Sequence, residues 1–196
     1  MKRIFLTLLA LVTFVACNNT GDINVIIPNG YDLAFDENGD CYSKTTQGIT
    51  QEEFEEKVVG HAWREVSNKR ILENGEIEGG PEDLVLDGGS RHHLYFEQEN
   101  VVIDYFVGYV KREGEVRLYE CEGFKTYNSN FEAPKFYYDI EYKSCYRLIL
   151  EVTENNMSCI WKQSEKTYTL VKYTKMTETE LEEMQQEFTY DFGNYW

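Results

Sequence analysis

The sequence predicts a mainly β protein: an antiparallel up-and-down barrel or a strongly curved sheet, with a short N-terminal helix and a C-terminal helix. From Ala62 onward, runs rich in Val, Ile, Tyr and Phe alternate with short turn sequences that contain Gly, Asn or Asp. We count about eight to ten such runs, at the spacing typical of a sandwich or barrel. Only two short segments carry helical signals.

The first strand pair is expected near the start of the mature chain. Tyr31–Phe35 and Cys41–Lys44 flank a polar run that contains Asn38-Gly39. Because Asn-Gly readily supplies the two positive-φ positions of a tight turn, the pattern predicts a hairpin.

The two helices are marked by capping boxes, in which a Thr and the Glu three residues later satisfy each other's backbone N–H groups. Thr50 and Glu53 begin the first helix, and Gly60 is expected to end it. Thr177 and Glu180 begin the second. Its apolar residues recur with helical spacing and comprise Leu181, Met184 and Phe188.

The strands between the helices are expected to follow one another as antiparallel neighbours. The last three, at 146–153, 158–163 and 167–173, predict a meander joined by short polar turns. Alternation along Val101–Val110 puts Tyr105 and Tyr109 on one face of the sheet and Phe106 with Asp104 on the other.

The N-terminus predicts export and lipidation. Lys2 and Arg3 precede an apolar stretch that is too short to span a bilayer, which requires roughly 20 apolar residues. Phe14-Val15-Ala16-Cys17 resembles a bacterial lipobox, which implies a signal peptide over residues 1–16 and a lipid on Cys17. Two or more acyl chains hold a protein stably on a membrane.

The predicted organisation is therefore a signal peptide (1–16), a lipidated cysteine with a polar tether (17–30) and one β-rich domain (31–196). The expected location is the bacterial outer membrane, facing the periplasm, with surface exposure left open. The full chain has a net charge of −16, and removal of Lys2 and Arg3 makes it −18. Such a charge repels nucleic acid, so we expect no nucleic-acid partner.

Four cysteines remain beside Cys17, an even number that allows two disulfides in an exported protein. They are Cys41, Cys121, Cys145 and Cys159. Free buried thiols are the alternative. No cysteine has a His at metal-ligand spacing, and we expect neither a metal nor a cofactor.

The order of a short helix, a Gly-x-x-Trp that opens a strand (Gly60 to Trp63), antiparallel strands and a late helix resembles the lipocalin-like domains of exported bacterial lipoproteins. The lipocalin pattern usually has one residue between this Gly and Trp, whereas two stand here. The resemblance implies that Trp63, with Gly60 beside it, closes one end of a barrel. It also implies that the other end can hold a small apolar ligand.

Motifs of catalysis are missing from the sequence: it has no nucleophile elbow, no phosphate-binding loop and no thiol-protease signature. We therefore expect a non-enzymatic protein. An enzyme is not excluded, because the sequence does not show which of its 35 acidic residues lie close together in space. The residues considered for a ligand pocket are Tyr105, Tyr109, His92 and His93. The leading hypothesis is a binding module for a small apolar molecule or lipid. The alternative is a protein-interaction or structural component of the cell envelope, whose barrel is filled by its own side chains.

Overall fold

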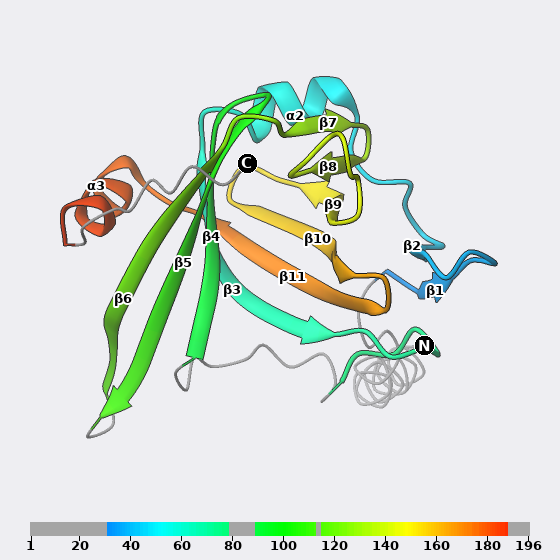
Figure 1. The fold of residues 1–196 in the computed structure, drawn as a ribbon, viewed down its shortest axis with the longest axis horizontal. Coiled ribbons are helices and arrows are strands. Elements are labelled where there is room, and N and C mark those ends of the chain that lie inside the picture. The colour runs from blue at the N-terminus through cyan, green and yellow to red at the C-terminus, as the bar shows by residue number, and fades with distance from the viewer. Residues whose placement is uncertain (1–30, 79–88, 113–114, 188–196) are drawn as a thin grey trace, which may run out of the picture.

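A computed structural model describes residues 31–78, 89–112 and 115–187. Its main feature is a nine-stranded antiparallel sheet curved into a half-barrel, accompanied by a small two-stranded sheet and two helices (Figure 1). The predicted mainly β fold is thereby confirmed. Within these ranges, neither helix has the length and apolar character needed to cross a membrane.

The large sheet has up-and-down topology. Its strands are β3 (Ala62–Arg70), β4 (Gly89–Gln98), β5 (Val101–Arg112), β6 (Glu115–Thr126), β7 (Asn130–Glu132), β8 (Lys135–Tyr137), β9 (Tyr146–Val152), β10 (Asn156–Ser164) and β11 (Thr167–Lys175). The spatial order is β6-β5-β4-β3-β11-β10-β9-β8-β7. Strands that are consecutive in the chain are therefore neighbours, except β6 and β7 at the two edges, and β11 pairs with β3. Because the edge strands β6 and β7 do not pair with each other, the sheet is a half-barrel and not a closed barrel.

The predicted C-terminal meander is confirmed by β9, β10 and β11, which pair in order. The predicted N-terminal hairpin is also present, as β1 (Leu33–Phe35) and β2 (Cys41–Ser43). The expected two-residue Asn-Gly turn is wrong, since Gly39 has a positive φ and Asn38 does not. The Asp36 carboxylate instead accepts the backbone N–H groups of Asn38 and Asp40, which stabilises a longer loop.

Both predicted helices are present. Helix α2 (Gln51–Lys57) begins at the Thr50–Glu53 capping box. Gly60, with a φ of +79°, turns the chain into β3 in a conformation that other residues rarely adopt. Helix α3 (Glu178–Glu187) begins with the same reciprocal bonds between Thr177 and Glu180.

The interior of the half-barrel is closed at one end by α2 and the β7–β8 hairpin (Figure 1). We call the aromatic residues packed there the aromatic plug: Phe54, Trp63, Phe96, Phe131 and Phe136. Phe54 stacks on Phe131 with ring centroids 4.1 Å apart, and it meets Phe96 edge to face. The Trp63 side chain is fully buried within this cluster.

Two further clusters cover the opposite face of the sheet. Met184 of α3 packs against Tyr105, Ile103 and Val107 of β5, which confirms the alternation expected for that strand. The β1–β2 hairpin covers the other end, where Leu33 and Cys41 lie among residues of β9, β10 and β11. Helix α3 and the β1–β2 hairpin thus cover the outer face of the sheet, and α2 covers one end of the interior face.

Candidate functional site

The interior face becomes more exposed with distance from the aromatic plug. Three successive cross-strand pairs lead away from the plug along β4 and β5: Phe96–Val102, Leu94–Asp104 and His92–Phe106. The first pair is fully buried. In the third, 29% of the His92 side chain is exposed and Phe106 is partly exposed. Along β10 the fully buried Cys159 is likewise followed by the partly exposed Trp161.

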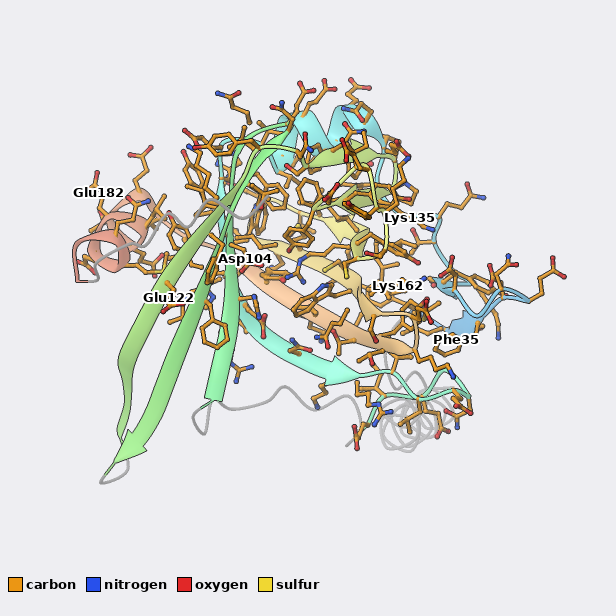
Figure 2. The ribbon with its side chains drawn as sticks, viewed as in Figure 1. Phe35, Asp104, Glu122, Lys135, Lys162 and Glu182 are labelled. Atoms are coloured by element: carbon orange, nitrogen blue, oxygen red, sulfur yellow. The ribbon has the colours of Figure 1, made fainter. Side chains whose placement is uncertain are left out.

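Next to the plug lies a group of buried or half-buried polar residues, which we call the polar layer: Glu65, His92, Asp104, Arg147 and Tyr173. They come from five different strands. Asp104 of β5 faces Arg147 of β9 across the interior, with 3.9 Å between Oδ2 and Nη2. Figure 2 shows Asp104 in the space between the β4–β6 wall and the β9–β11 wall.

The strands β3 and β4 separate at the polar layer. Their backbones pair only at Ala62–Tyr95 and Trp63–Leu94, after which the strands diverge (Figure 1). Side chains replace the lost ladder. The Glu65 N–H donates to His93 Nδ1 at 3.1 Å, and the His92 N–H donates to Glu65 Oε2 at 3.0 Å. These bonds satisfy backbone groups that would otherwise be buried without partners.

The two adjacent histidines have opposite electrostatic environments. Burial lowers the pKa of His93 to about 3, with the charges of Arg64 and Arg91 acting in the same direction. His93 is therefore neutral, as its acceptor role at Nδ1 requires. Burial also acts to lower the pKa of His92, but the hydrogen bond and the charge of Asp104 outweigh it, and the pKa is raised. Nδ1 of His92 lies 2.9 Å from Asp104 Oδ1.

Arg147 is fully enclosed within the polar layer, with 1% of the residue exposed. Its guanidinium carbon lies 4.0 Å from the centroid of the Trp161 ring, a cation–π contact. Its Nε–H donates to the Tyr138 hydroxyl. Among the described residues, neither Nη1 nor Nη2 has a hydrogen-bond partner.

The four residues expected to form a pocket are not brought together as one group. His92 faces the interior, where its ring contacts Trp161 and Phe106. Tyr105 lies on the opposite face beneath α3, where its hydroxyl accepts a hydrogen bond from Gln185 Nε2 at 2.8 Å. His93 pairs across the strands with Tyr105, while its ring bonds to the β3 backbone. The side chain of Tyr109 lies outside the described residues.

The cysteines are free where they are described. Cys41 and Cys159 are buried on opposite faces of the sheet, and Cys145 is half-buried. Burial raises the pKa of Cys159 to about 11 and that of Cys41 to about 12, so both remain thiols at neutral pH. The side chain of Cys121 lies outside the described part, as does Cys17.

Sequence reasoning did not identify Glu65, Arg147, Trp161 or Tyr173 as site residues. A signal for Arg147 was present, because it stands next to the apolar residues Leu148, Ile149 and Leu150 of β9. Asp104 likewise stands next to apolar residues of β5. A charge within an apolar strand is costly unless it is paired, which makes such positions candidates for function.

Comparison with protein-family models, with curated proteins and with solved structures finds no match. The chemistry of the polar layer must therefore be judged from its own geometry. Nowhere in the described ranges do three or more His, Cys, Asp or Glu side chains gather as metal ligands would.

Proposed function

We propose that this protein is a membrane-anchored lipoprotein of the bacterial envelope that acts as a non-enzymatic binding module. Its ligand is a small apolar molecule or lipid, held on the interior face of the half-barrel. The observation that carries this proposal is the exposure gradient along that face, from the fully buried Phe96–Val102 pair to the partly exposed His92–Phe106 pair.

The chemistry of the exposed part suits an apolar ligand. Phe106, His92 and Trp161 form a continuous row of rings, with centroid distances of 5.5 Å and 4.9 Å. His92 and Trp161 come from strands that are not neighbours in the sheet, so the row spans the interior. Small-molecule sites typically combine such apolar rings with a few placed polar groups, a combination that the polar layer supplies.

The membrane anchor is supported by the sequence. Phe14-Val15-Ala16-Cys17 resembles a lipobox, and the polar residues 18–30 suit a tether between the lipid and the domain. The anchor residues themselves lie outside the described part of the chain. In this proposal the lipid on Cys17 holds the protein at the outer membrane, and the high negative charge keeps nucleic acid away.

The test is native mass spectrometry of the full chain with Cys17→Ser, purified from the envelope of its own source. We expect an additional mass that is released on unfolding. Phe106→Ala, which shortens the row of rings, should lower the occupied fraction. The matched control is Tyr42→Ala in the β1–β2 hairpin. It removes an aromatic ring from a residue that is 40% exposed, and it should leave the occupied fraction unchanged.

An occupied fraction that is the same in Phe106→Ala and Tyr42→Ala would place the ligand elsewhere and contradict the proposed site. A chain that carries no additional mass and binds no apolar probe would contradict the proposed function. That result would favour the alternative, a protein-interaction or structural component of the envelope.

A further inference from the structure

Arg147 carries hydrogen-bonding capacity that its surroundings do not use. A guanidinium offers five N–H donors, and here Nε–H donates to the Tyr138 hydroxyl. The Cys159 sulfur, a weak acceptor, also lies beside the guanidinium. Nη1 and Nη2 are buried without a hydrogen-bond partner among the described residues. Buried polar groups in proteins are nearly always hydrogen-bonded, so these two nitrogen atoms are unusual even though the opposite charge of Asp104 lies nearby.

The neighbouring carboxylates are engaged elsewhere. Oδ1 of Asp104 is bonded to His92, and its Oδ2 lies 3.9 Å from Arg147 Nη2, beyond hydrogen-bond distance. Oε2 of Glu65 accepts the His92 N–H, and its Oε1 faces the Arg91 guanidinium at 3.7 Å. Both carboxylates therefore balance the charge of Arg147, but neither accepts a hydrogen bond from its Nη atoms.

A second buried donor lies beside Arg147. The guanidinium carbon of Arg147 is 5.6 Å from the centroid of the Tyr173 ring, and the Tyr173 hydroxyl also has no hydrogen-bond partner among the described residues. Burial raises the pKa of Tyr173, so the hydroxyl keeps its proton and remains a donor. The unused groups at this position are therefore mainly donors, and they match an acceptor that carries negative charge.

We infer that Arg147, supported by Tyr173, is a subsite for the oxyanion of an amphipathic ligand, either a carboxylate or a phosphate monoester. The planar edge of a guanidinium matches both groups by two parallel hydrogen bonds. This inference rests on the proposed function and deepens it, because the row of rings at Phe106, His92 and Trp161 would hold the apolar part of the same ligand.

The experiment compares three probes with the same eight-carbon chain: octanoate, octyl phosphate and 1-octanol. Binding to the full chain with Cys17→Ser is measured by calorimetry, and by the fluorescence of Trp161 together with the other tryptophans. We expect the better of the two acids to bind about 10- to 100-fold more tightly than 1-octanol, as charged hydrogen bonds predict. Whichever acid binds more tightly identifies the source of the oxyanion.

Two substitutions locate the effect. Arg147→Met should reduce the affinity for the acid to that for 1-octanol. Arg64→Met removes an arginine from β3 that pairs with Glu180 of α3, and it should leave the preference unchanged. The comparison between probes in the unsubstituted site needs no variant, so it remains decisive if Arg147→Met fails to fold.

The outcomes separate the two proposals. Equal binding of 1-octanol and both acids would overturn the oxyanion subsite and leave the apolar binding function standing. A preference for an acid that survives in folded Arg147→Met would overturn the role of Arg147. Failure of all three probes to bind would contradict both proposals.

Discussion

The aromatic plug and the polar layer occupy adjacent positions on the same face of the same strands, yet they are built on opposite principles. On β5 the step from one to the other is a single inward-facing position, from Val102, which packs with the plug, to Asp104. In the plug, the four phenylalanine rings fill the space, and Phe54 lies 4.1 to 6.1 Å, between ring centroids, from the other three. In the polar layer, the Nη atoms of Arg147 have no hydrogen-bond partner among the described residues. The plug therefore serves stability, and the polar layer is the part of this face to which we assign ligand binding in our proposal.

The largest expected effect tests the plug against the exposed end of the same face. Phe54→Ala removes a fully buried ring that contacts three other rings, and we expect a loss of about 3–5 kcal/mol in the free energy of unfolding. Phe106→Ala removes a partly exposed ring, and we expect a loss of about 1 kcal/mol. Urea denaturation measures both. Equal losses would contradict the division of the interior into a packed end and an open end.

The next effect is the dependence of stability on pH that follows from the lowered pKa of His93. The folded pKa of about 3 lies below the ordinary value near 6.5, so the unfolded chain binds a proton first. The resulting stability is complete above pH 6.5 and is lost as the pH falls toward the folded pKa. Between pH 6.5 and 4.5 His93 should account for a loss of about 2 kcal/mol.

This contribution is measured by comparing wild type with His93→Gln in denaturant titrations at the two pH values. The stability advantage of wild type over the variant should shrink by that amount on acidification. His92→Gln is the control with the opposite sign, since the pKa of His92 is raised. If the difference in stability between wild type and His93→Gln is the same at both pH values, His93 binds a proton as readily in the folded as in the unfolded chain, and its pKa is not lowered.

The prediction of this fold from sequence worked where the signal is local. The capping boxes at Thr50 and Thr177 fixed both helix starts, and the alternation along β5 assigned Tyr105 and Asp104 to opposite faces correctly. The Asn38-Gly39 turn failed because a side-chain acceptor, Asp36, competed with the intrinsic preference of the dipeptide.

The site was harder to predict because its residues meet only in three dimensions. Asp104 and Arg147 each stand next to apolar residues of a strand, so each could be recognised as unusual. Their meeting across the interior depends on the curvature of the sheet and on the β3–β11 pairing, which no local pattern encodes. The pocket hypothesis at Tyr105 relied on aromatic density, which does not distinguish a ligand surface from the contact with α3.

A smaller effect tests the ion pair within the polar layer. His92 has a raised pKa because of Asp104, so the pair stabilises the fold below the ordinary histidine pKa, and this stability is lost as the pH rises through the folded pKa. Asp104→Asn should therefore be more destabilising at pH 5 than at pH 9, by about 1 kcal/mol. Its effect on Arg147 is present at both pH values and cancels in the difference. Equal destabilisation at the two pH values would contradict the pairing.

The smallest effect is expected at the ion pair on the outer face. Arg64 Nη2 lies 3.0 Å from Glu180 Oε1, but the two side chains are 39% and 37% exposed, so solvent and salt screen their attraction. Arg64→Met should cost about 0.2–1 kcal/mol at low salt and less at high salt. Measurement at pH 7.5 keeps the neighbouring His93 neutral in both proteins. A larger loss that does not depend on salt would mean that solvent does not screen this exposed ion pair. The contrast between exposed charges and the buried charge of Arg147 would then lose its physical basis.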